Sequence, residues 1–383
     1  MLTKLALFFS LGMADLLRLL LQVAEKAANV ARVCRQEAPL FQLLVQEKTG
    51  DDKNKKFVQD FKTLADVVIQ EMIRHDVGAQ FPEMVGFIHG EESNKFENGL
   101  GESVTVTVCS TEGETATLLA SVLDNNHTAA SLLARAIHRD PVTTDAQADA
   151  LMVPLNPSDL GIWIDPIDAT SQYIEGREEV LEEGRLFPSG LHCALVLIGV
   201  YLRSSGEPVM GVINQPFNYK DPASGSWSGR HFWGVSCGGV NTSSESRPKD
   251  VPDRGPSVVL SSSEKQVVKE ALISFYGPDK LMYASGAGYK ILCVIQGLAD
   301  IYVLSEGSTF KWDSCAPHAL LRALGGGVAD LAESLQDGQT ELTYHQPREE
   351  CKGADRWANH GGLVAYRDQA QLHSVIRTLK GKL

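Results

Sequence analysis

Apolar residues recur at helical spacing through most of the first 140 positions. The longest such stripe runs from Leu16 to Cys34, and the period indicates an amphipathic helix. Thr111 and Glu114 form a capping-box pattern that opens another helix. The segment 48–56 is polar and rich in Asp and Lys, and we predict a mobile loop there. The predicted helices of this part are 13–35, 62–75, 111–123 and 129–138.

The middle of the chain consists instead of short apolar runs separated by Gly, Pro and Ser. This spacing is typical of an antiparallel meander. A stretch rich in Ser, Pro and charged residues, 241–256, is the best candidate for a linker. The predicted strands before it are 161–164, 192–202, 209–214 and 231–236.

Beyond the linker, β-like and α-like patterns alternate, which favours a partly parallel sheet. We therefore predict an α/β (α+β) protein in two parts: 13–245 with the antiparallel sheet, and 246–383 as an α/β half. The predicted elements of the second part are strands 257–260, 280–284 and 300–304 and helices 265–275, 289–297 and 314–324.

Composition limits the function classes. The 383 residues are 43% hydrophobic and 22% charged, as in ordinary soluble globular proteins. A net charge of −13 argues against nucleic acid or an anionic membrane as the main partner. The same charge would repel a phosphorylated substrate unless metal ions invert the potential at the site.

The cysteines and the N-terminus indicate a cytoplasmic protein. The seven cysteines are scattered and include no C-x-x-C pair, which favours reduced thiols. Cys315 has no evident basic partner and is interpreted as a packed helix thiol. The apolar run 5–11 lacks a convincing cleavage site. Met13 is a plausible start of the natural protein, so residues 1–12 are predicted to be an N-terminal extension.

Carboxylates occur in three separated motifs with apolar neighbours: Gly90-Glu91-Glu92-Ser93, Trp163-Ile164-Asp165-Pro166-Ile167-Asp168-Ala169-Thr170 and Lys311-Trp312-Asp313. Ionised carboxylates in apolar surroundings need a compensating cation or donor. A cluster of oxygens suits Mg²⁺, which also takes ligands from substrate phosphate. Each motif alone also fits a plainer interpretation: a solvated acidic pair, an Asx-type turn or a helix cap.

The central motif carries the most information. Pro166 biases Asp165 toward an extended conformation, so we predict that the strand ends there. Asp165, Asp168 and the Ile167 carbonyl could then converge on one cation. The following residues resemble a helix start, where free amides attract anions.

Two further segments could contact phosphate. Gly286-Ala287-Gly288-Tyr289-Lys290 lies between a predicted strand and helix, where glycines allow close backbone approach and Lys290 offers charge. Ser261 to Lys265 also joins a strand to a helix, and Ser263 could be an N-cap, a phosphate contact or both.

Together these motifs resemble the lithium-sensitive, Mg²⁺-dependent phosphomonoesterase superfamily that includes inositol monophosphatase and fructose 1,6-bisphosphatase. The signature comprises an upstream Asp66, Glu91-Glu92, Asp165 to Thr170, Trp312 to Ala316, and Gly325-Gly326-Gly327. Within it, the likeness is greatest to the inositol polyphosphate 1-phosphatase family. It extends from about Met13 to the C-terminal helix and includes Asp355-Arg356-Trp357-Ala358-Asn359.

The resemblance implies an αβαβα layered sandwich and a set of site residues. One Mg²⁺ would be held by Glu91, Asp165 and the Ile167 carbonyl, and a second by Asp165, Asp168 and Asp313. Asp66 with Thr170 would position the attacking water, and Asp66 could help hold a third ion. The further residues implied are Glu91 as catalytic, Glu92 as a metal ligand, and Asp168, Ala169, Thr170, Ser263, Lys265, Gly286, Ala287 and Lys290 as substrate contacts.

The resemblance also implies Mg²⁺-dependent, Li⁺-inhibited removal of the 1-phosphate from inositol 1,4-bisphosphate and inositol 1,3,4-trisphosphate by in-line attack of a metal-activated water. A monomer is expected. The alternatives are a 3′(2′),5′-bisphosphate nucleotidase on the same scaffold and a non-catalytic inositol phosphate binder. Two departures stand out: Ala169 replaces a Ser or Gly frequent in relatives, and 177–185 does not match the family.

Overall fold

The computed structural model describes residues 12–36, 45–54, 59–98, 101–154, 156–179, 186–246, 255–338 and 340–383. The predicted extension therefore lies outside the described residues except for Gly12. Parts of the predicted loop (55–58), of the unmatched stretch (180–185) and of the linker (247–254) also lie outside them. Within the described part of the chain, no helix combines the length and apolar character needed to cross a bilayer.

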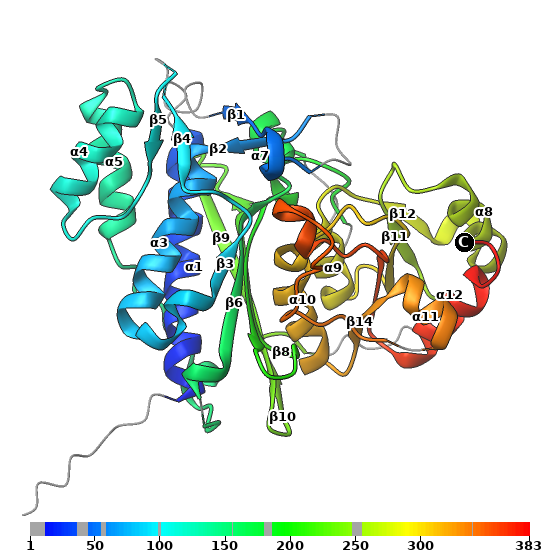
Figure 1. Cartoon of the computed structure of the whole chain (residues 1–383). Helices are drawn as coiled ribbons and strands as arrows, with labels where there is room; N and C mark the ends of the chain where they lie inside the picture. Colours follow the sequence, from blue (N-terminus) through cyan, green and yellow to red (C-terminus); the bar gives the residue numbers. More distant parts are fainter. Residues whose placement is uncertain are drawn as a thin grey trace, which may run out of the picture.

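The molecule is built in five layers, helix–sheet–helix–sheet–helix (Figure 1). The first sheet has the order β10-β9-β8-β7-β6-β3, and only β3 and β6 run parallel. The meander predicted from the sequence is thereby confirmed. The strands of this sheet are β3 (Ile88–Gly90), β6 (Leu160–Asp168), β7 (Leu195–Leu202), β8 (Pro208–Lys220), β9 (Trp227–Cys237) and β10 (Val240–Ser243).

The outer face of this sheet is covered by α1 (Met13–Gln36) and α3 (Leu64–Gln80). Leucine, valine and alanine side chains of both helices are buried in one core with the sheet, as their helical spacing predicts. The first part of the chain also contains α4 (Glu112–Val122), α5 (His127–His138), α6 (Ala146–Asp149), and the two-stranded pairs β1 (Val45–Glu47) with β2 (Phe61–Thr63) and β4 (Lys95–Glu97) with β5 (Ser103–Thr105).

The central layer contains α9 (Ala287–Gln296) and α10 (Lys311–Ala323). Helix α10 approaches the first sheet closely because three neighbouring strands carry glycine beneath it. A Cβ at Gly199, Gly211 or Gly234 would lie within 2.8 Å of α10 atoms. This groove fixes the position of α10, whose first turn carries Asp313.

The second sheet has the order β12-β11-β13-β15-β14 and is partly parallel, as predicted. Its strands are β11 (Val258–Leu260), β12 (Leu281–Tyr283), β13 (Ile301–Leu304), β14 (Gly327–Asp330) and β15 (Leu363–Tyr366). The outer helices are α8 (Gln266–Tyr276), α11 (Leu331–Asp337) and α12 (Gln369–Leu379), and α7 (Thr170–Glu175) follows β6. Short 3₁₀ turns are η1 (Gly50–Asp52), η2 (Pro82–Phe87), η3 (Pro157–Asp159), η4 (Leu191–Cys193), η5 (Pro278–Lys280) and η6 (Gly353–Trp357).

The predicted division at residue 245 falls between the strands of the two sheets, and it stays a prediction. Cys315 is a free thiol buried in α10, in agreement with its interpretation as a packed residue.

One sequence prediction is wrong, and one alternative that the sequence left open is excluded. Strand β6 does not end at Asp165 but continues to Asp168. The mobility of the segment 48–56 stays a prediction, although Lys48 at its start is buried. Ser263 is not an N-cap, since α8 begins at Gln266 after Lys265 without a side-chain cap.

Candidate active site

A cleft of about 340 Å³ opens where α7, α9 and α10 begin, between the two sheets. The sequence motifs meet there although they are far apart along the chain. The expected site residues that line it are Glu91, Asp165, Ile167, Asp168, Ala169, Thr170, Ser263, Gly286, Ala287, Lys290 and Asp313.

An irregularity in β6 gives both of its aspartates access to this cleft. In a regular strand, residues three apart face opposite sides of the sheet. The pairing of β6 with β7 shifts register between Asp165 and Asp168. Pro166 lies within this interval and has no amide to donate to the ladder, which explains why the break occurs there. Strand pairing resumes at Asp168, and this is why the predicted strand end was wrong.

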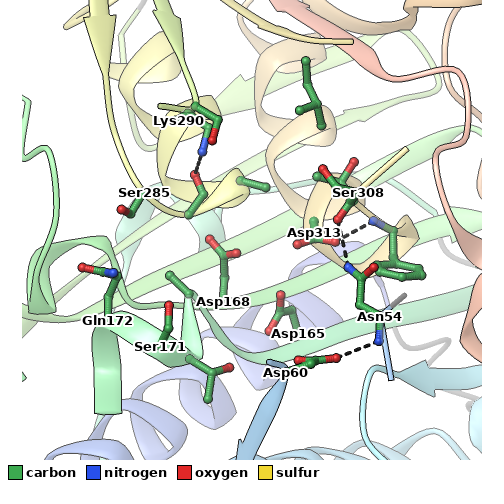
Figure 2. Close-up of a pocket in the computed structure, with 18 of the residues that line it drawn as sticks. Asn54, Asp60, Asp165, Asp168, Ser171, Gln172, Ser285, Lys290, Ser308 and Asp313 are labelled. Atoms are coloured by element: carbon green, nitrogen blue, oxygen red, sulfur yellow. Dashed lines mark hydrogen bonds between the residues drawn. The ribbon is translucent and has the colours of Figure 1, made fainter. Parts of the chain in front are cut away.

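The three aspartates converge. One carboxylate oxygen of each of Asp165, Asp168 and Asp313 lies within 4.8 Å of the other two. Figure 2 shows the three side chains around the same space in the cleft. Asp165 is 1% exposed and Asp168 is 5% exposed. The fold therefore brings these three aspartates close together, as the sequence motifs predicted.

Burial and mutual repulsion disfavour ionisation of this cluster. Burial, then Glu91 and Asp168, raise the pKa of Asp165 well above its ordinary range. Burial, then Asp168 and Glu91, do the same for the pKa of Asp313. Burial raises the pKa of Asp168 to about 6, although Lys290 opposes the rise. The Oδ1 atom of Asp165 is buried without a hydrogen-bond partner. An all-oxygen set with an unsatisfied buried carboxylate fits a hard divalent cation such as Mg²⁺.

We expect this burial to make the stability of the metal-free protein pH-dependent. The folded pKa of Asp168, about 6, exceeds its ordinary value of 3.8, so the folded protein keeps a proton that the unfolded chain releases. The free energy of unfolding should thus fall as pH rises from about 4 to 6, by on the order of 3 kcal/mol from this carboxyl. Urea titrations in EDTA should show that the stability of wild type relative to Asp168→Asn declines over this interval; a constant difference would contradict the assignment.

Lys48 is a site residue that the sequence did not indicate. Its Nζ lies 2.5 Å from Oε1 of Glu91 and 2.6 Å from Oε1 of Glu92, and the side chain is 2% exposed. Burial by itself would lower the pKa of Lys48, but Glu91 and Glu92 outweigh it and raise the pKa well above the ordinary value. An internal ammonium ion therefore offsets negative charge at the acidic pair, of which Glu92 is buried and Glu91 lines the cleft.

Asp66 and Glu92 lie behind the cleft rather than among the residues that line it. Asp66 is in the first turn of α3, where its Oδ2 accepts hydrogen bonds from the Thr63 amide and hydroxyl at 2.6 and 2.5 Å. Its Oδ1 is buried without a partner. Burial raises the pKa of Asp66 to about 7 and that of Glu92 to about 8. Asp66 is thus fixed by one oxygen and leaves the other for a ligand or water.

The chain reverses at Ala169, which has φ 63° and ψ 47° and directly precedes α7. This left-handed conformation costs an alanine roughly 1–2 kcal/mol. The next residue, Thr170, donates its hydroxyl to the Ile167 carbonyl at 3.0 Å. The turn places both residues in the cleft lining.

Substitutions at Ala169 should test this strain. A β-branched side chain is least compatible with positive φ, so Ala169→Val should lower the free energy of unfolding by about 1–3 kcal/mol. Ala169→Gly is the matched control and should be at least as stable as wild type. Urea unfolding curves of wild type and the two variants measure both effects. Equal stabilities of Ala169→Val and Ala169→Gly would show that the backbone at residue 169 is not strained.

Lys290 supports the glycine loop as well as lining the cleft. It is 4% exposed, and its ammonium donates to the carbonyls of Ala284 at 3.2 Å and Gly286 at 2.6 Å. Burial lowers its pKa. Ser263 lines the cleft, with its hydroxyl 2.9 Å from that of Ser261. Lys265 does not line it; its Nζ is exposed and donates to the Ser305 carbonyl at 3.3 Å.

Asn359 holds the segment that carries Asp313. Its Nδ2 donates to the Phe310 carbonyl at 2.9 Å and to the hydroxyls of Thr309 and Ser314 at 3.3 and 3.2 Å. The Phe310 amide in turn donates to Oδ2 of Asp313 at 2.6 Å. The motif 355–359 was noted in the sequence only for its resemblance, and no local signal revealed this role.

Known proteins resemble this chain in both sequence and structure. The model of the Inositol monophosphatase family matches residues 16–372. The "Inositol polyphosphate 1-phosphatase" of Homo sapiens is 47% identical over 96% of this chain and 97% of that protein. A Homo sapiens protein named "3'(2'),5'-bisphosphate nucleotidase 1" is 31% identical, over 50% of this chain and 54% of that protein.

Among solved structures, Thermotoga maritima IMPase has a TM-score of 0.52 at 14% identity, covering 96% of this chain and 98% of that one. This structural likeness shows the shared fold, which confirms the predicted layered architecture. The family match covers nearly the whole chain and includes every acidic motif that forms the cleft. The chain belongs to the Inositol monophosphatase family.

Proposed function

We propose that this protein is a metal-dependent phosphomonoesterase that removes the 1-phosphate from inositol 1,4-bisphosphate and inositol 1,3,4-trisphosphate. The observation that carries the proposal is the convergence of Asp165, Asp168 and Asp313 at the base of the cleft. The substrate class rests on 47% identity, over almost the full length of both chains, to the human protein named for this activity.

The charge balance of the cleft supports a requirement for cations. Among the described residues that line it, Lys290 is the sole base, whereas there are eight acids: Asp52, Asp60, Glu91, Asp165, Asp168, Glu264, Glu306 and Asp313. A substrate with several phosphates would be repelled by this surface unless divalent ions neutralised it. Two or three Mg²⁺ ions are proposed, and Li⁺ is expected to inhibit by interfering with them.

The residues present divide into two ligand sets. Glu91, Asp165 and the Ile167 carbonyl would hold one ion, and Asp165, Asp168 and Asp313 the other. Asp66 would help hold a third ion, and Glu92 is a further expected metal ligand. Bound ions supply neutralisation of phosphate charge and a lowered pKa of the attacking water.

The chain itself aligns the reactants. Asp66, fixed through Thr63, and Thr170 would orient the attacking water, and the Asp66 carboxylate would accept its proton. The amides of Ala169 and Thr170 would hold the scissile phosphate, and Ser263, Gly286, Ala287 and Lys290 the rest of the substrate. Alignment and electrostatic stabilisation would supply most of the rate. Because Lys265 lies outside the cleft lining, its contact requires a change of side-chain conformation.

A phosphate-release panel tests the proposal. Inositol 1,4-bisphosphate, inositol 1,3,4-trisphosphate and 3′-phosphoadenosine 5′-phosphate would be compared under Mg²⁺ titration, with and without Li⁺. We expect fastest release from the inositol substrates, none in EDTA, and inhibition by Li⁺. Faster turnover of the nucleotide would favour the nucleotidase alternative, and binding of inositol phosphates without release would favour a non-catalytic role. A monomer in the cytoplasm is expected, to be checked by sedimentation and microscopy.

A further inference from the structure

A second cluster of metal-ligating side chains lies at the loop around η6, and none of its three residues is among the described residues that line the cleft. It consists of Cys351, Asp355 and His360, each partly exposed. One ligand atom of each lies within 4.8 Å of the other two. The Nε2 atom of His360 lies 3.8 Å from the Cys351 Sγ and 3.7 Å from Oδ1 of Asp355.

The two separations that involve His360 are close to those around a tetrahedral zinc ion. With Zn–S near 2.3 Å and Zn–N or Zn–O near 2.0–2.2 Å, tetrahedral coordination places ligand atoms about 3.3–3.6 Å apart. The observed 3.7 and 3.8 Å differ from that range by a few tenths of an ångström. A fourth position would remain for water. In the metal-free structure the Nε2–H of His360 donates to the Asp355 carbonyl at 2.9 Å, and a bound metal ion would replace that proton.

The ligand chemistry separates this cluster from the acidic one. A thiol and an imidazole suit Zn²⁺ and other borderline-soft metals, whereas the oxygen-only set of Asp165, Asp168 and Asp313 suits Mg²⁺. Mixed Cys, His and carboxylate ligands within ten residues would therefore select a different ion.

Backbone hydrogen bonds preform the loop that carries the three ligands. The Cys351 amide donates to the Arg348 carbonyl at 3.2 Å, and the Arg348 amide donates to the Arg356 carbonyl at 2.9 Å. Gly307 packs against His360 so closely that a Cβ there would lie 2.8 Å from the His360 Cα. Little chain entropy would thus be lost when a metal binds.

We propose that Cys351, Asp355 and His360 form a site for a soft divalent cation of the Zn²⁺ class. The site is distinct from the proposed Mg²⁺ site but linked to it, because His360 directly follows Asn359, whose side chain holds the Asp313 segment. Neither the family match nor the proposed phosphatase function requires it.

Cobalt is the probe for this site. Co²⁺ would be titrated into the full-length, reduced protein in excess Mg²⁺, which fills the oxygen cluster. We expect one equivalent to produce a thiolate-to-cobalt charge-transfer band, and Zn²⁺ to displace it. Cys351→Ser should abolish the band, and His360→Gln should weaken Co²⁺ binding by more than about tenfold.

Cys237→Ser is the matched control, because Cys237 is also a free, partly exposed thiol, and it should keep the band. Circular dichroism verifies that all variants are folded. Absence of the band in the wild type, or its persistence in Cys351→Ser, would overturn the site. Because the readout is spectroscopic, the result for this site does not depend on whether the protein releases phosphate.

Discussion

Replacing Asp165 by Asn should abolish phosphate release while making the metal-free protein more stable. Asp165 belongs to both proposed ligand sets, so its loss should weaken both ions together. Metal ions contribute several kcal/mol to stabilising transition-state charge, which corresponds to a loss of about 10³-fold or more in kcat/KM. In the absence of metal, the same change removes a buried carboxylate that Glu91, Asp168 and Asp313 repel, so the protein should unfold at a higher temperature.

Two measurements on Asp165→Asn separate these effects. Thermal unfolding of the variant in EDTA should give a higher Tm than that of wild type, and added Mg²⁺ should not raise the Tm of the variant further. In wild type, by contrast, Mg²⁺ at one hundred times its Kd should increase the free energy of unfolding by about 2.7 kcal/mol. Glu306→Gln is the matched control: it removes one negative charge from the same cleft but from outside the aspartate cluster, and should keep most of the rate and the Mg²⁺ response. A normal rate at low Mg²⁺ in Asp165→Asn would refute the ligand assignment.

Replacing Lys48 by Met should strongly destabilise the metal-free protein. The ammonium lies between Glu91 and Glu92 in a buried position. Removing one partner of a buried ion pair leaves uncompensated charge and costs about 3–5 kcal/mol. Since divalent ions at Glu91 could supply part of the missing charge, Mg²⁺ should recover some of that loss.

The control for Lys48→Met is Lys53→Met in the same segment. Lys53 lies 3.3 Å from Glu47 at a partly exposed position, where an ion pair is worth about 0–1 kcal/mol. The double variant Lys48→Met/Glu92→Gln should be more stable than Lys48→Met, because it removes one of the two carboxyl groups that Lys48 contacts. Urea unfolding in EDTA measures all four proteins; a Lys48→Met cost no larger than that of Lys53→Met would show that the buried pair has no energetic role.

Local pattern predicted most regular elements correctly. The stripe from Leu16 to Cys34 became α1, and the β-branched runs became the strands of the meander, because burial of one face imposes the corresponding period. The strand at Asp165 was predicted too short, because the rule for residues before proline does not foresee that pairing resumes beyond an irregularity.

The amino-acid sequence by itself determined the main helices and strands, the acidic motifs and, through their combination, the family. Only the tertiary structure decided which oxygens meet, because Asp165 and Asp313 are separated by almost 150 positions and are brought together by the glycine groove beneath α10. The fold likewise decided that Lys48 is a buried counter-ion and that Asn359 holds the Asp313 segment. Neither role has a local signal, since a lysine in a polar stretch and an asparagine in a loop are ordinarily solvated, and burial against distant residues changes their energetics.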